Sequence, residues 1–222
     1  MLRALPSVLL AVLLSVGCAD TTVLHDDSSS ATVHLRIDSV ASAWPYTPGK
    51  QGLLTVLEQE AKLASRHSRF SLKKPADLRW THTQLHQLRH AIDPKTENNG
   101  PGIGYGVIRA AQDIAAEMHE AVDTPGASDN VRQHALRIAA ASEHISTLAT
   151  EARELAAQGL AADSPTVTAQ VSERIAAVLD QIVYGRDQND DGKIDQDAPE
   201  GGVTHLRQLV ATMMAGEGLT LK

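Results

Sequence analysis

Apolar side chains recur at helical spacing from residue 51 to the end of the chain. In the first segment they are Leu53, Leu54, Leu57, Ala61 and Ala64. Steps of three and four residues place side chains on one face of an α-helix, whereas a strand alternates at every second residue. The same spacing recurs in five further segments that begin near residues 75, 105, 128, 164 and 203. The pattern therefore predicts six helices.

Local signals set the expected ends of these helices. Pro75 is placed where the second helix begins, and Ser128 or Asp129 would cap the fourth, which we expect to end near residue 157 because Gly159 follows. Ser164 precedes a proline at the first turn of the fifth helix, a favourable start. Because the joining segments are mostly short, neighbouring helices should be antiparallel. We therefore predict an all-α fold, an up-down antiparallel helical bundle with an extended N-terminal tether.

The first twenty residues have the organisation of an export signal. Arg3 precedes a short apolar run over 9–16, too short for a membrane span of about 20 residues, and small residues then precede Cys18, the one cysteine. This order resembles the lipobox of bacterial lipoproteins, although Ser15 stands where leucine is usual. The resemblance implies a lipid anchor on Cys18 and, with Ala19 next, an outer-membrane protein facing the periplasm. An ordinary secretory signal cleaved near Gly17 is the alternative.

Residues 18–50 are rich in Ser, Thr, Asp, Pro and Gly, which is typical of a solvated linker. Val33, Leu35 and Ile37 alternate with polar residues, so we expect an extended segment laid against the domain. The predicted organisation is a signal peptide over 1–17, a lipidated N-terminus and linker over 18–50, and a bundle over 51–222.

A second motif lies between the last two predicted helices, in residues 187–200. Oxygen-bearing side chains alternate there, followed by Gly192, an apolar Ile194 and another aspartate. The string resembles the loop of EF-hand calcium proteins, and a hard cation takes six to eight oxygen ligands. The resemblance implies that the ligands are Asp187, Asn189, Asp191, the carbonyl of Lys193, Asp195 and Glu200. The twelfth position is Ala198 in place of a glutamate, so Glu200, two residues later, or Asp197, one residue earlier, would have to bend in to supply that carboxylate, and Pro199 restricts the route.

Histidines form the other candidate site. His82, His86 and His90 are spaced at i, i+4, which places neighbouring imidazoles on one helix face, although the helical wheel turns His90 toward solvent. His134 points inward by the same count. Imidazole nitrogens bind zinc, copper and nickel. The alternative hypothesis is thus a periplasmic transition-metal protein that uses His67, His82, His86, His119 and His134.

Composition narrows the function classes. The net charge is −7 and aromatic residues make up 3% of the chain, which argues against nucleic-acid binding. The glycine-rich stretch 100–106 lacks the residues of a nucleotide-binding loop, and we find no catalytic motif. We therefore expect a lipid-anchored binding or structural module rather than an enzyme, with calcium as its ion and the membrane as a partner; the sequence does not identify a protein partner.

Overall fold

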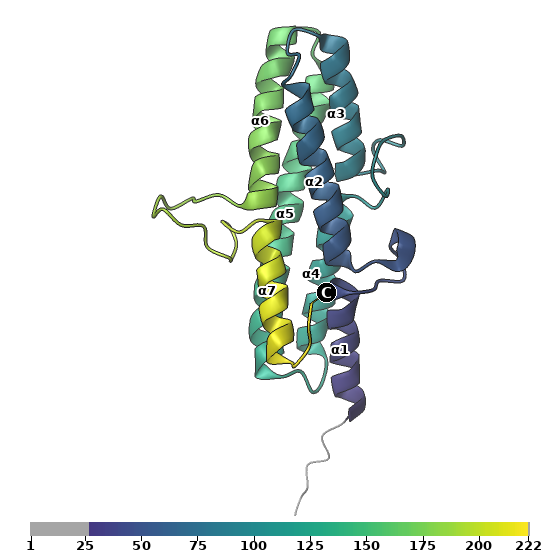
Figure 1. The fold of residues 1–222 in the computed structure, drawn as a ribbon, viewed down its shortest axis with the longest axis vertical. Coiled ribbons are helices and arrows are strands. Elements are labelled where there is room, and N and C mark those ends of the chain that lie inside the picture. The colour runs from purple at the N-terminus through teal and green to yellow at the C-terminus, as the bar shows by residue number, and fades with distance from the viewer. Residues whose placement is uncertain (1–26, 222) are drawn as a thin grey trace, which may run out of the picture.

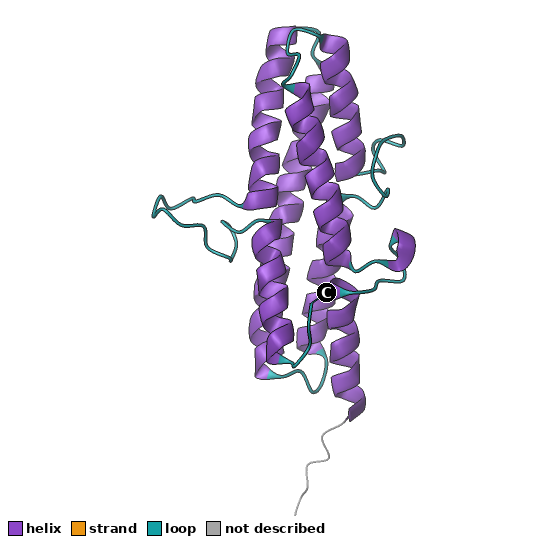
Figure 2. Cartoon of the chain, viewed as in Figure 1, coloured by secondary structure: helices purple, strands orange, loops and turns teal. Residues whose placement is uncertain are grey.

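The computed structural model describes residues 27–221, and these residues fold into helices joined by loops, with no strand among them (Figures 1 and 2). The elements are α1 (Asp27–Ala41), the 3-10 turn η1 (Pro48–Lys50), α2 (Leu53–Ser71), α3 (Leu78–Ile92), α4 (Val107–Asp123), α5 (Asp129–Ala161), α6 (Pro165–Tyr184) and α7 (Val203–Gly216). The predicted all-α bundle is confirmed.

The helices form four antiparallel rods, three of which are interrupted. Figure 1 shows α1 followed by α2 along one rod, α3 followed by α4 along a second, and α6 followed by α7 along another. The long helix α5 is the remaining rod, and it packs against α3 and α4 and against α6 and α7. Because α2 contacts both α3 and α6, the rods close into a ring around one core.

Helix α5 is the continuous element on which both halves of the bundle pack. Its 33 residues span about 50 Å at 1.5 Å per residue. Many of its inward positions are alanine or serine, and these small side chains let neighbouring helices approach closely. Gly159 was expected to end this helix, but it lies inside it and is buried. A β-carbon there would come within 2.7 Å of Leu85 Cδ1, so close packing explains this glycine.

Side-chain caps begin several helices at the predicted positions. Ser128 accepts a hydrogen bond from the backbone N–H of Val131, and Ser164 caps α6 in the same way. The expected start of α3 at Pro75 is wrong. The cap is Asp77, whose side chain accepts the N–H of Trp80, so the helix begins at Leu78.

The N-terminal segment differs most from the prediction. The structure places a 15-residue helix, α1, where a linker and an extended segment were expected. Val33, Ile37 and Val40 are buried against the bundle, while Leu35 is 66% exposed. The alternating pattern was therefore misread, because positions 33, 37 and 40 also follow helical spacing. Arg36 adds an ion pair, with its guanidinium 3.0 Å from the carboxylate of Glu117 on α4.

None of the helices within residues 27–221 is long and apolar enough to cross a membrane.

The packing of α1 can be tested with one matched pair of variants. Ile37→Ala removes a fully buried side chain and should lower the free energy of unfolding by about 2–5 kcal/mol. Leu35→Ala, on the exposed face of the same helix, should change it by less than about 0.5 kcal/mol. Urea denaturation followed by circular dichroism measures both. Equal, small losses for the two variants would show that α1 does not belong to the core.

Candidate functional site

The acidic segment predicted to bind calcium projects from the interruption between α6 and α7 (Figure 1). The chain leaves α6 at Gly185, whose φ of 79° is a conformation that favours glycine. A β-carbon there would come within 2.5 Å of the Glu200 carbonyl oxygen. The two ends of the loop are joined by a hydrogen bond of 2.9 Å, which the Arg186 N–H donates to that carbonyl. The loop therefore begins and ends at one point beside the bundle.

The side chain of Glu200 organises the loop from within. It is 5% exposed although the loop around it is open to solvent. Its Oε1 accepts the backbone N–H groups of Gln188 and Asn189 at 3.0 and 3.2 Å, and its Oε2 accepts the N–H of Asp195 at 3.0 Å. These backbone donors lower the pKa of the Glu200 carboxyl, the N–H of Asp195 most, because they favour its charged form.

The EF-hand-like residues also bond to the loop's own backbone. Asp187 Oδ2 accepts the N–H of Gly192 at 2.8 Å, which bends the chain at the predicted glycine. Asn189 Oδ1 accepts the N–H of Asp191, and Asp191 Oδ1 accepts the N–H of Lys193, each at 2.9 Å. Asp187 Oδ1 is different, because it is hidden from solvent and has no hydrogen-bond partner.

The predicted ligands thus share one loop but are not gathered around one point. Asp191 and Asp195 are exposed, and the oxygens of Glu200 are taken up by backbone donors. Across residues 27–221, no three His, Cys, Asp or Glu side chains are grouped as metal ligands, and this holds for the loop as well. Hydrogen bonds between the loop's own residues therefore hold its shape, and one carboxylate oxygen, Asp187 Oδ1, has no hydrogen-bond partner.

Helix α5 fastens the loop to the bundle through residues that sequence reasoning missed. Arg137 makes two hydrogen bonds to the carboxylate of Asp197, at 2.6 and 3.1 Å. His144, further along α5, forms a hydrogen bond with the backbone of Pro199, and burial lowers the pKa of its imidazole against the opposing effect of that bond. Nothing in the local pattern marks Arg137, because its role depends on a contact 60 positions away in the chain.

The histidines proposed as an alternative metal site are kept apart. His67 Nδ1 lies 2.8 Å from Gln84 Oε1, His86 Nδ1 lies 2.6 Å from Glu97 Oε2, and His119 Nε2 lies 3.0 Å from Glu143 Oε1. His82 and His134 each have a buried ring nitrogen without a partner. No triad of possible ligands forms among them in the described part of the chain.

Two histidines of the predicted stripe instead hold the interruption between α3 and α4. His86 contacts the Glu97 side chain, and His90 Nδ1 lies 2.6 Å from the Glu97 carbonyl oxygen. His90 was expected to face solvent, but it is buried at 8% exposure. Gly100 packs directly on its ring, so the returning loop covers a helix face that would otherwise be exposed.

The glycine-rich stretch in the same interruption packs around a buried carboxyl side chain. Glu60 on α2 is 1% exposed, and its Oε1 accepts the N–H groups of Ile103 and Tyr105 at 3.1 and 3.3 Å. Gly102 has a φ of 110°, and a β-carbon there would come within 2.4 Å of Glu60 Oε2. Burial raises the pKa of Glu60 above its ordinary value, although backbone donors from residues 103–106 oppose the shift.

This raised pKa predicts a pH dependence of stability. Between its unfolded and folded pKa values Glu60 binds more protons in the native protein than in the unfolded chain. Its contribution to stability is therefore fully present below about pH 4.5 and is lost as the pH rises through the folded pKa. Glu60→Gln should remove that fall, which denaturant titrations at several pH values would detect. Glu151→Gln, at an exposed position on α5, is the control. Parallel pH profiles for Glu60→Gln and the wild type would contradict this account of Glu60.

Cys18 and the predicted signal peptide lie outside the described residues. Comparisons of the chain with protein-family models, with curated proteins and with solved structures give no match. The function is therefore argued from the residues of this chain and their arrangement.

Proposed function

We propose that this protein is a lipid-anchored module of the bacterial envelope whose helical bundle binds one calcium ion in the loop over residues 187–200. The role is one of binding and structure rather than catalysis. The ion would lie where the rod formed by α6 and α7 is interrupted, so it would fix the two helices relative to each other.

One observation carries the calcium proposal. Asp187 Oδ1 is removed from solvent and accepts no hydrogen bond, whereas its partner Oδ2 bonds to the N–H of Gly192. Leaving a charged oxygen without a partner is costly, and a bound cation would satisfy it. The side chain is already oriented by its second oxygen, so no reorganisation of Asp187 is required.

The remaining ligands would come from the same loop. Asp191 and Asp195 are exposed, so their side chains can turn inward without breaking into the core. Asn189 and the carbonyl of Lys193 would add neutral oxygens, as in the EF-hand loops that the string resembles. Glu200 holds the backbone of positions 188, 189 and 195, and it would have to share a carboxylate oxygen between these N–H groups and the ion.

A calcium ion bound this way would stabilise the fold modestly. Extracellular calcium modules bind with dissociation constants of about 10⁻⁴–10⁻³ M. A ligand at about ten times its dissociation constant adds about 1.4 kcal/mol to the free energy of unfolding. In a chain of this size that energy corresponds to a rise in melting temperature of about 3–6 °C.

The melting temperature with calcium and with chelator tests the site directly. The wild type should melt about 3–6 °C higher with calcium at tenfold its dissociation constant, whereas Asp187→Ala should melt equally in both conditions. Differential scanning calorimetry measures the transitions.

The matched control is Asp190→Asn. It removes one negative charge from the same loop at a position outside the proposed ligands, and asparagine tolerates the positive φ of 58° found there. This variant should keep the calcium shift. A wild type that melts at one temperature with chelator and with about 10 mM calcium, tenfold the weakest dissociation constant expected, would rule out the site.

The lipid anchor rests on the sequence around Cys18. The described structure begins at α1, whose first turn lies at one end of the long axis (Figure 1). An anchor on Cys18 would then reach the bundle at that end, through the residues before Asp27. Each buried CH₂ of an acyl chain contributes about 0.8 kcal/mol to membrane binding, so lipidation would hold the protein at the bilayer surface.

Labelling with a fatty acid tests the anchor. The chain expressed with its own N-terminus in a bacterium should incorporate labelled palmitate and sediment with membranes. Cys18→Ala should lose both the label and the sedimentation, because the thiol is the proposed attachment point. Ser15→Ala, in the same motif, should retain the label. Palmitate on the Cys18→Ala chain, or none on the wild type, would refute the proposal.

A further inference from the structure

The half of the bundle that contains α1 is open on one side. Helix α1 packs on α2 and α4, and α7 packs on α5, but α1 and α7 do not pack closely on each other. The chain after α7 turns back at Gly218, whose φ is 70°, and runs into this opening (Figure 1). The N–H of Leu219 donates to the carbonyl of Met214 at 2.8 Å, which fixes the turn. A short tail therefore lies where contact between two helices would close the ring.

A groove of about 560 Å³ remains between α1 and this tail. Met214, which is buried, and Leu219, which packs on the core, form one side of it. The α1 side carries residues spaced by four, three and four positions, which is the repeat of one helix face: Ala31, Leu35, Asp38 and Ser42. Pockets for small molecules have volumes of about 300–1,000 Å³, so the space suits a small ligand.

Leu35 is the apolar residue that the fold leaves uncovered in this groove. Its side chain is 66% exposed, whereas Ile37 in the same helix is fully buried. A single exposed leucine needs no explanation by itself. This one borders an apolar groove and lies one helical turn before Asp38, so carbon and charge lie side by side on α1.

The fixed charges beside the groove are negative. No lysine or arginine of the described chain lines it. Asp38 is exposed, and its carboxylate forms no ion pair within the part of the chain that the structure describes. His34 also lines the groove, and its Nε2 lies 3.8 Å from Glu217 Oε2, so a second carboxylate is close by. Asn130 donates a hydrogen bond to Glu217, which holds that carboxylate in place.

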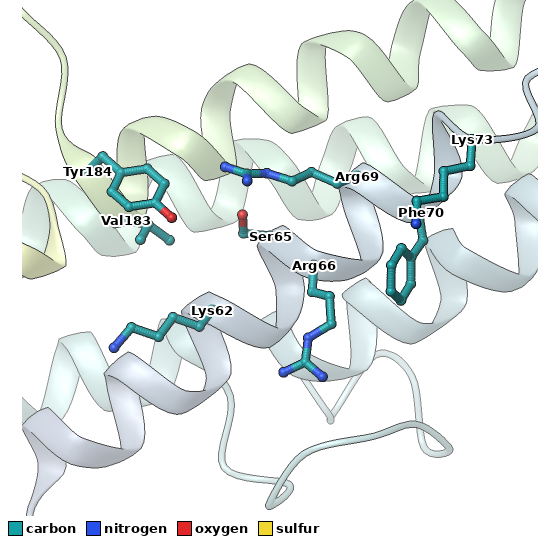
Figure 3. A pocket seen from close by; sticks show the side chains of 8 residues that line it. All are labelled: Lys62, Ser65, Arg66, Arg69, Phe70, Lys73, Val183 and Tyr184. Atoms are coloured by element: carbon teal, nitrogen blue, oxygen red, sulfur yellow. The ribbon is translucent and has the colours of Figure 1, made fainter.

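This negative charge is a local property of the groove. Arg36, next to Leu35 in the chain, pairs with Glu117 on α4 at 3.0 Å and does not line the groove. A groove between α2 and the end of α6 has the opposite lining, with basic side chains along α2 and the Tyr184 ring at its end (Figure 3). The two grooves differ in sign although they belong to one chain of net charge −7. The lining at α1 therefore does not simply repeat the overall charge.

We propose that the groove between α1 and the C-terminal tail binds a soluble lipophilic cation, an amine or quaternary ammonium carried on an aliphatic chain. The aliphatic chain lies on Leu35 and Met214, and the charged nitrogen lies beside Asp38. Charge complementarity selects this class, because an anionic head group would meet carboxylates and no basic side chain. Covering Leu35 removes apolar surface from water, which a small inorganic cation could not do. The site is independent of calcium and of the lipid anchor.

Calorimetric titration with three probes separates the contributions of charge and chain. The purified full-length protein is held in phosphatidylcholine nanodiscs at about pH 8, where histidine is neutral, and empty nanodiscs are the blank. Octyltrimethylammonium should bind saturably to one site. Octanoate, with a similar chain and the opposite charge, should bind at least about tenfold more weakly. Tetramethylammonium, a head group without the chain, should give no measurable binding.

Two matched pairs of variants assign the binding to this groove. Asp38→Asn should weaken octyltrimethylammonium binding about three- to tenfold, whereas Asp163→Asn, at an exposed acid remote in sequence, should change it less than about twofold. Leu35→Ser should weaken it about fivefold or more, and Leu136→Ser, at an exposed leucine on α5, should not. All four positions are exposed, so the melting temperatures should be unchanged.

Three results would overturn the proposal. Equal binding of octanoate and octyltrimethylammonium would show a groove that recognises the chain alone. Equal weakening by Asp38→Asn and Asp163→Asn would show attraction to the net charge. No saturable binding of octyltrimethylammonium at about 10 mM would show that the groove takes no such ligand, and a dimeric mass in light scattering would then identify a second copy of the chain as its occupant.

Discussion

Three hydrogen bonds that the Glu200 carboxylate accepts from backbone N–H groups determine the shape of the acidic loop. The proposed calcium site depends on this shape. The hydrogen bonds draw positions 188, 189 and 195 around one carboxylate and lower its pKa, so the carboxylate stays charged to a lower pH than an ordinary glutamate. With the loop closed in this way, Asp187 Oδ1 is enclosed and lacks a partner. This oxygen lacks a hydrogen-bond partner because the loop closes around it. The proposed calcium ion would bind to it.

A second buried carboxylate also accepts backbone N–H groups from a loop that interrupts a rod, but its pKa is shifted in the opposite direction. Glu60 accepts backbone N–H groups from the glycine-rich loop, as Glu200 does from the acidic loop. Burial dominates at Glu60 and raises its pKa, whereas backbone donors dominate at Glu200 and lower its pKa. A buried carboxylate thus shapes each loop: Glu60 holds the glycine-rich loop to α2, whereas Glu200 binds the acidic loop to itself and α5 joins that loop to the bundle through Arg137.

The sequence predicted the helices from residue 51 onward because each carries a wide apolar face. It failed at α1, where Val33, Leu35 and Ile37 fit two periodicities and the polar composition suggested a linker. It also located the acidic loop, but not its fastening by Arg137, since that contact joins distant parts of the chain. The histidine spacing was read as a possible metal site, whereas the structure uses His86 and His90 to hold a loop.

The most direct measurement is a calcium titration of the ¹⁵N-labelled protein followed by amide chemical shifts. The amide of Gly192 donates to Asp187, so it reports on the carboxylate at the centre of the proposed site. Saturable shifts centred on Gly192 and confined to residues 185–202, with a dissociation constant at or below about 10⁻³ M, are expected. An unchanged Gly192 amide at tenfold higher calcium would contradict the account, because Asp187 would then hold no ion.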